Sequence, residues 1–158
     1  MGKVVSRSEI VSLVKELKKE NKKIVFTNGC FDIIHIGHIR YLKESAKFAD
    51  ILIIGLNSDS SVKKLKGEKR PINPEMDRAE LLSELSIVDY VVIFDETSPS
   101  VLIDEIKPDI YTKGADYTLE TLPEREVVGK NNIEVKFIDF VLGKSTSNII
   151  KKIEQKNN

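Results

Sequence analysis

The chain has 158 residues, with 25 basic side chains, 25 acidic side chains and two histidines, so its formal net charge is zero. A neutral chain is a poor candidate for binding long nucleic acid, because that affinity comes from many cationic contacts to phosphate. One cysteine, no signal-peptide core and no apolar run of the roughly 20 residues needed to span a bilayer together lead us to expect a cytoplasmic protein without a nucleic-acid or membrane partner.

Helix-like and strand-like segments alternate along the chain. Apolar residues recur at helical spacing over residues 8–20, and β-rich runs occupy residues 23–28 and 50–57. Helices are also predicted at 36–48, at 73–88, from 98 onward and at 145–156, and strands at 89–94, 108–113 and 132–140. Residues 60–75 and 113–126 are interpreted as long polar connections.

This alternation predicts an α/β fold in which helices cover both faces of an open parallel sheet, that is, a doubly wound sheet. We expect one compact unit, with an N-terminal helix within residues 1–22 and the ligand-binding domain at residues 23–158. In such folds ligands bind beyond the carboxyl ends of the strands. The long connections leave that edge, where binding loops belong.

The stretch TNGCFDIIHIGH, residues 27–38, follows the first predicted strand and contains both histidines of the chain, His35 and His38. His35 is expected at the start of a helix and His38 about one turn later, so that both rings point the same way. Helix N-termini attract phosphate, and two imidazoles there can donate hydrogen bonds to phosphoryl oxygens. A structural pair, or a metal site with Asp32 as third ligand, are the alternatives.

The H-x-G-H pattern after a G-x-F-D turn resembles the cytidylyltransferase-like nucleotidyltransferases. Further stretches, at residues 55–82, 88–99, 108–117 and 145–153, are similar to the adenylyltransferase branch of the bacterial ADP-heptose synthases, in a stand-alone form without the sugar-kinase region. Glycerol-3-phosphate cytidylyltransferases show an arginine three residues before a glycine where this chain has Phe140 before Gly143. The resemblance therefore favours the heptose branch and implies a Rossmann-like nucleotidyltransferase fold.

The resemblance also implies a reaction. AMP would pass from ATP to D-glycero-D-manno-heptose 1-phosphate, giving ADP-heptose and pyrophosphate, with Mg²⁺ bound mainly by ATP and no dedicated metal site on the protein. Transfer of CMP to glycerol 3-phosphate, or FAD synthesis, are the enzymatic alternatives, and a nucleotide-binding regulatory protein is the non-enzymatic one. Relatives are often dimers, so we expect a homodimer.

By this resemblance, catalysis would depend on His35, His38 and Lys66. The expected ATP contacts are Asn28, Gly29, Cys30, Phe31, Asp32, His35, Gly37, His38, Lys63, Lys66, Arg78, Lys113, Gly114, Asp116, Ser145, Thr146 and Ser147. The expected contacts to the acceptor are Asp32, Asn57, Asp59 and Thr97.

Several of these residues also have ordinary structural interpretations. The lysines after Asp59 can form a solvated charged loop, and the hydroxyls at 145–147 can simply cap a helix. Arg78 can form an ion pair with Glu75 or Asp77 instead of orienting phosphates. Cys30 is interpreted as a small residue beside the phosphates, because the implied reaction uses no protein nucleophile.

Overall fold

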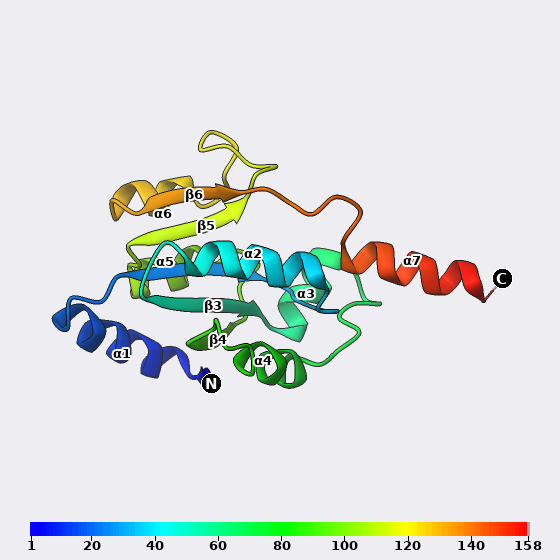
Figure 1. Ribbon diagram of the computed structural model, residues 1–158, viewed down its shortest axis with the longest axis horizontal. Coiled ribbons are helices and arrows are strands. Elements are labelled where there is room, and N and C mark those ends of the chain that lie inside the picture. Colours follow the sequence, from blue (N-terminus) through cyan, green and yellow to red (C-terminus); the bar gives the residue numbers. More distant parts are fainter. Residues whose placement is uncertain (158) are drawn as a thin grey trace.

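The computed structural model describes residues 1–157 and contains a six-stranded sheet in which every neighbouring pair of strands is parallel (Figure 1). The strand order is β1-β4-β3-β2-β5-β6. The strands are β1 (Lys3–Val5), β2 (Ile24–Gly29), β3 (Ile51–Asn57), β4 (Tyr90–Phe94), β5 (Ile110–Gly114) and β6 (Glu134–Ile138). The predicted open parallel α/β fold is confirmed.

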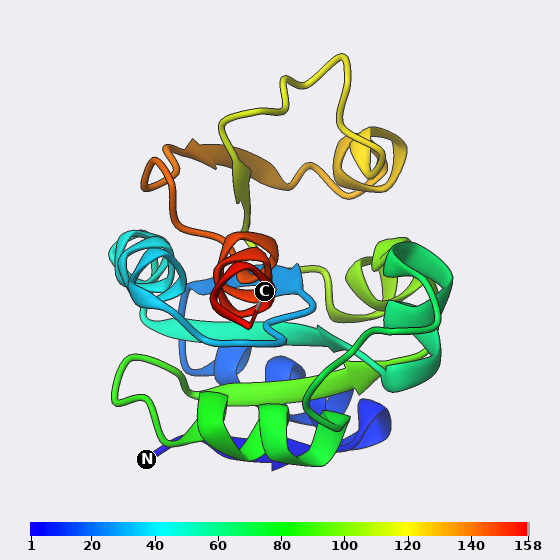
Figure 2. The ribbon, with the colours of Figure 1, turned by 90° about the vertical axis from the view of Figure 1, so that its right-hand side faces the viewer.

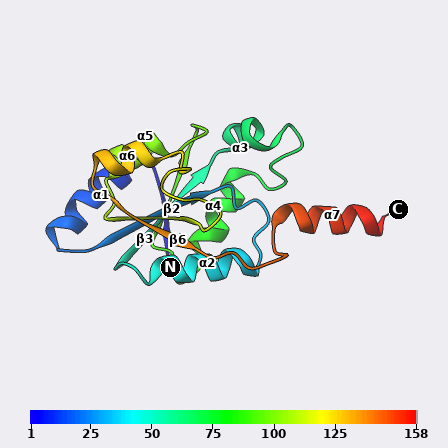
Figure 3. The same ribbon diagram turned by 90° about the horizontal axis from the view of Figure 1, so that it is seen from above.

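Helices cover both faces of this sheet, as the end-on view in Figure 2 and the view from above in Figure 3 show. The helices are α1 (Arg7–Lys19), α2 (Ile36–Ala46), α3 (Asp59–Lys66), α4 (Glu75–Ser83), α5 (Ser100–Ile106), α6 (Arg125–Lys130) and α7 (Thr146–Lys156). Helices α2 and α4 bury Leu42 and Leu82 against one face, and α1, α5 and α6 bury Ile10, Ile103 and Val128 against the other. The sheet is therefore doubly wound.

Three elements lie where the sequence analysis placed none. Strand β1 adds an edge to the sheet by pairing with β4, and α3 and α6 occupy parts of the two segments that were interpreted as connections. Helix α3 buries only Ser61 and Val62, so its sequence carries too few apolar residues to show a helical period. It begins where the Ser58 side chain accepts a hydrogen bond from the Ser61 N–H.

Other boundaries also differ from the prediction. The helix predicted to reach residue 88 ends at Ser83, after which turns lead into β4. The strand predicted over residues 132–140 is limited to Glu134–Ile138. None of the helices within residues 1–157 is long and apolar enough to cross a membrane.

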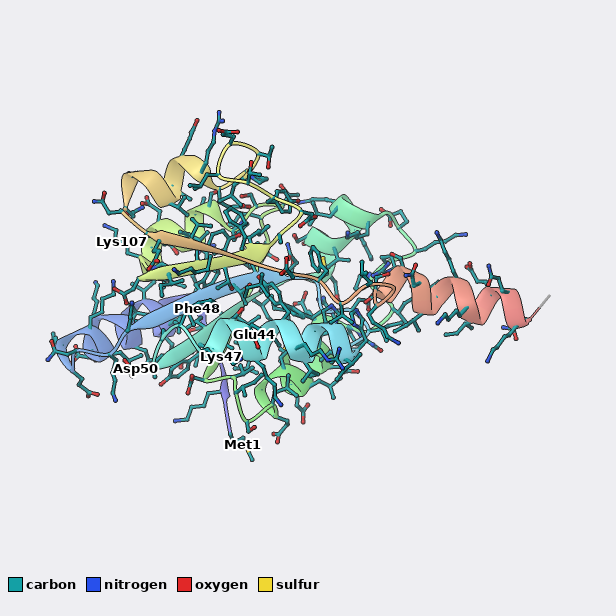
Figure 4. The ribbon with its side chains drawn as sticks, turned by 45° about the horizontal axis from the view of Figure 1, so that its top comes forward. Met1, Glu44, Lys47, Phe48, Asp50 and Lys107 are labelled. Atoms are coloured by element: carbon teal, nitrogen blue, oxygen red, sulfur yellow. The ribbon has the colours of Figure 1, made fainter. Side chains whose placement is uncertain are left out.

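All strands run in the same direction, so their carboxyl ends meet at one edge of the sheet. Helices α2 and α7 begin at this edge, and α7 projects away from it (Figure 1). Phe48, Asp50 and Lys107, labelled in Figure 4, lie toward the opposite edge. The loops that the sequence analysis assigned to ligand binding therefore gather on one side of the molecule.

Candidate functional site

A cleft of about 880 Å³ opens at the carboxyl edge of the sheet. Its lining comes from the ends of β2, β3 and β5, the loop after β4, and the starts of α2 and α7. Most of the expected site residues line this cleft, namely Asn28, Gly29, Cys30, Phe31, Asp32, His35, Gly37, His38, Asn57, Lys66, Thr97, Lys113, Gly114, Asp116, Ser145, Thr146 and Ser147. Lys63, Arg78 and Asp59 are not part of the lining.

The two histidines form the cap of helix α2. His35 has extended backbone at the N-cap, and its Nδ1 accepts a hydrogen bond from the Gly37 N–H at 3.1 Å. The His38 Nδ1 accepts from the His35 N–H at 3.4 Å. A neutral imidazole has one N–H and one acceptor nitrogen. Each ring therefore has its proton on Nε2, which is the nitrogen left to donate to a ligand.

Both rings are neutral at pH 7. Burial lowers the pKa of His35, and the nearby Lys144 lowers it further. Burial also lowers the pKa of His38, to about 4, with a smaller effect from His35. The rings stack with centroids 3.8 Å apart, a distance at which two imidazolium cations would repel each other. The pair is thus a double hydrogen-bond donor without net charge.

Gly37 lies between the two histidines because no larger residue fits there. A Cβ atom at this position would lie 2.8 Å from Cε1 and 2.9 Å from Nδ1 of the His35 ring. Such contacts are closer than van der Waals distance, so a side chain would displace the ring. The glycine is required by the packing of the histidine cap itself.

A second helix start lies beside the histidine pair. The Ser145 side chain accepts a hydrogen bond from the Asn148 N–H at 3.0 Å and caps α7. The Thr146 hydroxyl donates to the Ile33 carbonyl at 3.1 Å, which ties α7 to the loop before α2. Two helix N-termini therefore face one cleft, and their free N–H groups and positive dipole ends favour an anion.

Asp32 fixes the loop between α3 and α4 at the rim of the cleft. Burial alone would raise the pKa of this carboxyl, but hydrogen bonds from the Asn73 and Ile72 N–H groups and from Arg70 lower it. The Arg70 Nε donates to Asp32 at 2.6 Å. Both carboxylate oxygens are thus already bound by the loop, and no group of three or more potential metal ligands occurs within residues 1–157.

Arg78 joins the ends of two strands from beneath the cleft. Its side chain is fully buried and donates to the carbonyl oxygens of Cys30 at 2.6 Å, Asn57 at 2.9 Å and Asn73 at 2.9 Å. Its remaining nitrogen donates to the Asp59 carboxylate at 2.8 Å. Every nitrogen of the guanidinium is therefore engaged by protein oxygens.

These contacts correct one expectation. Arg78 forms a structural ion pair, which was the alternative to phosphate contact, but its partner is Asp59 and neither Glu75 nor Asp77, the examples expected from sequence. Glu75 instead accepts a hydrogen bond from the Asp59 N–H. Because Asp59 and Arg78 lie below the lining, they support the floor of the cleft from behind.

On the other side of the cleft, a hydrogen-bonded chain orients Asn28. Lys113 donates to the Tyr111 hydroxyl at 3.3 Å, and that hydroxyl donates to the Asn28 Oδ1 at 2.6 Å. Burial, followed by the charge of Glu124, raises the pKa of Tyr111 well above its ordinary value, so the hydroxyl keeps its proton. The Asn28 side-chain N–H groups are consequently available to a ligand.

Part of the lining was not expected from the sequence. The missed residues are Tyr41, Leu65, Arg70, Ser98, Pro99, Tyr117, Pro123, Glu124, Phe140, Val141, Leu142, Gly143, Lys144 and Asn148. Most of them lie in loops after strand ends. Leu65, Arg70, Ser98, Pro99, Tyr117 and Asn148 lie in stretches that resemble the ADP-heptose synthases, but no motif marks the others. The expected binding edge of a parallel sheet is the one signal that could have pointed to them.

Comparison with known proteins identifies related chains. Residues 26–155 match the cytidylyltransferase-like family. The bifunctional protein HldE of Nitratiruptor sp. is 54% identical over 146 residues, which cover 92% of this chain and 30% of that protein. The bifunctional protein HldE of Campylobacter concisus is 54% identical over 157 residues, covering 99% of this chain and 32% of that protein.

A solved structure has the same fold. The lipopolysaccharide core biosynthesis protein from Thermoplasma volcanium GSS1 matches with a TM-score of 0.62 and 37% sequence identity, over 76% of this chain and 97% of that one. This chain spans about a third of the length of the HldE proteins it matches. With a family match over residues 26–155 and the histidine cap inside it, the chain belongs to the cytidylyltransferase-like family.

Proposed function

We propose that this chain is an adenylyltransferase that transfers AMP from ATP to D-glycero-D-manno-heptose 1-phosphate, giving ADP-heptose and pyrophosphate. Family membership and the similarity to the HldE proteins support a nucleotidyltransferase. The resemblance of four sequence stretches to the ADP-heptose synthases supports the heptose acceptor. The observation that carries the proposal is the stacked, neutral histidine pair, because it provides two Nε2–H donors beside two helix N-termini.

The proposed chemistry is an in-line displacement. A phosphate oxygen of the acceptor attacks the α-phosphorus of ATP, a new P–O bond forms, and the bond to the β-phosphate breaks so that pyrophosphate leaves. Negative charge grows on the oxygens of the transferred and leaving groups. His35 and His38 would donate Nε2–H hydrogen bonds to these oxygens, which is the preorganised stabilisation that lowers such barriers.

No protein nucleophile takes part in this proposal. Cys30 lines the cleft, but burial raises the pKa of its thiol, and the charges of Lys66, Arg78 and Arg70 only partly offset that effect. A thiol of raised pKa is a weak nucleophile at pH 7. This supports direct transfer from ATP to the acceptor.

The triphosphate would lie between the starts of α2 and α7, in contact with those residues expected from sequence that line the cleft, which leaves out Lys63 and Arg78. We infer that Lys66 lies closest to the leaving pyrophosphate among the lysines of α3, because it lines the cleft and Lys63 does not. Mg²⁺ would arrive with ATP, bound mostly by phosphate oxygens. Asn57 and Thr97 are the cleft-lining candidates for acceptor contacts.

We also propose that the enzyme works in the cytoplasm as a homodimer with small-molecule substrates only. Zero net charge supports the absence of a nucleic-acid partner. Light scattering coupled to size-exclusion chromatography measures the molar mass directly. A monomeric mass near 17.9 kDa would contradict the dimer.

The decisive experiment is pyrophosphate release from ATP with and without D-glycero-D-manno-heptose 1-phosphate. We expect strong heptose-dependent release with ATP and little with CTP. Glycerol 3-phosphate with CTP and flavin mononucleotide with ATP are run in parallel as the alternative reactions. Release with CTP but not ATP would overturn the adenylyl transfer, and nucleotide binding without release for any pair would favour the regulatory protein.

A further inference from the structure

Glu124 is a buried carboxylate on the wall of the cleft, and the proposed mechanism does not use it. It occupies the N-cap position of α6, but its side chain makes no capping hydrogen bond. The residue is only 3% exposed and lines the cleft. The Glu124 side chain is thus directed away from its own helix and into the cleft.

The hydrogen bonds of this carboxylate are incomplete. Its Oε1 accepts from the Ser98 hydroxyl at 3.4 Å, and its Oε2 lies 3.7 Å from the Lys113 Nζ. The second distance is too long for a hydrogen bond. The Tyr111 hydroxyl also lies close to this carboxylate but donates its proton to Asn28, and the Glu124 Oε2 is one of two buried side-chain atoms within residues 1–157 without a partner. A buried acceptor without a donor is costly, so a ligand that supplies a donor would be favoured.

The second unpartnered atom is the Oε2 of Glu96, and it has a different setting. Glu96 forms an ion pair with Arg7 at 2.7 Å and is not part of the cleft lining. Glu124 therefore combines two properties that Glu96 does not, an unmet acceptor and a position in the ligand-binding cleft.

The position of Glu124 indicates which substrate reaches it. The histidine pair belongs to α2, which covers the same sheet face as α4, whereas Leu122 and Val128 on either side of Glu124 pack into the core on the opposite face. In an in-line displacement the attacking and leaving oxygens lie on opposite sides of the phosphorus. If the starts of α2 and α7 bind the leaving pyrophosphate, the acceptor enters from the Glu124 side.

The charge of Glu124 also disfavours a second phosphate as the ligand of this wall. A carboxylate repels anions, and its hydrogen-bond partner Ser98 carries a neutral hydroxyl. A neutral group that donates a hydrogen bond, such as a sugar hydroxyl, fits such a wall. Lys113, 3.7 Å away, offsets the charge of the carboxylate without saturating it.

We propose that Glu124 binds the acceptor, its carboxylate accepting a hydrogen bond from a hydroxyl of a phosphorylated polyol, with Ser98 and Lys113 orienting it. This inference rests on the proposed nucleotidyl transfer and adds a residue that selects hydroxyl-bearing acceptors. The ribose hydroxyls and the adenine amino group of ATP are the other hydrogen-bond donors in the reaction. The experiment must therefore separate binding of the acceptor from binding of ATP.

The test compares Glu124→Gln with the matched control Glu126→Gln, an exposed glutamate two residues along the same helix. Pyrophosphate release gives kcat and the KM of each substrate. We expect Glu124→Gln to raise the KM for the acceptor about tenfold or more, the usual effect of losing a hydrogen bond to a charged group. The KM for ATP should stay within about twofold, and Glu126→Gln should match the wild type.

The direction of the change in KM distinguishes a lost hydrogen bond from a general electrostatic effect. Both substrates are anions, so removing a negative charge from the cleft would by general electrostatics tighten their binding and lower KM. A raised KM for the acceptor alone therefore reports a lost hydrogen bond. A thermal melt of each variant records any structural effect of leaving Lys113 without its ion-pair partner.

Three outcomes would overturn the inference. They are an unchanged or lower KM for the acceptor, a raised KM for ATP instead, or a lower melting temperature with both KM values unchanged. Calorimetric titration of heptose 1-phosphate and glycerol 3-phosphate, in the presence of a non-hydrolysable ATP analogue, keeps the two proposals separate. If the wild type binds an acceptor but does not turn it over, only the proposed reaction is contradicted, and weaker acceptor binding by Glu124→Gln would still support the acceptor site. If the wild type binds neither acceptor, the acceptor site is overturned.

Discussion

The histidine pair and the segment from α3 to α4 were both expected to bind phosphate, but they are built in different ways. The histidine rings are oriented by backbone N–H groups within one helical turn. In the α3–α4 segment, residues 59–83, the two arginines are held by carboxylates distant in the sequence, Arg70 by Asp32 and Arg78 by Asp59. The lysines of α3 are exposed.

The arginines and the lysines of this segment therefore lie in different environments. A guanidinium presents several donors in a fixed plane and suits buried, multiply bonded positions, whereas an ammonium is a compact charge on a flexible stem. Here the arginines build the floor and rim of the cleft, and the lysines remain free. In the proposed reaction, the neutral histidines would bind the transferred phosphoryl group, and the exposed lysines of α3 would add positive charge from the side.

The largest effect is expected from removing a histidine donor. His38→Ala should lower kcat by about 10²–10³-fold, the typical cost of losing one preorganised donor to a transition-state oxygen. Pyrophosphate release measures this. Arg40→Ala, an exposed residue on the same helix, is the control and should keep full activity. Full turnover by His38→Ala would show that the pair is structural.

The next effect is on stability and tests the role of the buried arginine. Arg78→Met should lower the free energy of unfolding by about 3 kcal/mol or more, because three carbonyl oxygens and Asp59 lose their donor. Urea unfolding measures the change, with Arg40→Met as the exposed control. A variant as stable as the control would mean that these contacts contribute little.

A smaller effect should separate two lysines of one helix. Lys66 lines the cleft and Lys63 does not, although the sequence analysis expected both to bind ATP. Lys66→Ala should lower kcat/KM for ATP about tenfold through loss of a charged contact to phosphate, and Lys63→Ala should change it less than twofold. Equal effects of the two substitutions would mean that α3 shifts when ATP binds.

The last prediction concerns the pH dependence of stability. The folded protein lowers the pKa of His38 from 6.5 to about 4, so between these values the unfolded chain binds a proton that the folded chain does not. The free energy of unfolding is therefore undiminished by this group above pH 6.5, and it falls as the pH is lowered toward 4. Urea unfolding of wild type and His38→Gln at several pH values should show a stability difference that shifts against the wild type on acidification. Parallel curves would contradict the lowered pKa.

Much of the fold could be predicted from the sequence because parallel strands buried on both faces have distinctive apolar runs. The segment 50–57 is an example, and β3 at Ile51–Asn57 fills nearly all of it. Helix α3 could not be predicted in the same way, since a short helix at the surface buries too few side chains to show a period. Strand β1 has three residues and depends on β4 for its pairing.

The part of the site that lies within one local turn could be predicted from the sequence. H-x-G-H, residues 35–38, contains the donors, the cap and the required glycine within four positions, so the sequence displays the whole arrangement. Ser98 follows β4, whereas Lys113 is in β5 and Glu124 is in the loop after β5, so these side chains meet only in the folded chain and no local pattern reveals them. The tautomers of His35 and His38 likewise depended on backbone hydrogen bonds visible only in three dimensions.

The histidine cap has a consequence for how the active protein assembles. The contacts that start helix α2 are the same contacts that orient both rings, so helix initiation and arrangement of the donor pair are one event. In the proposed reaction, ATP would therefore meet two rings that the fold has already oriented, and its binding need not spend free energy on ordering them.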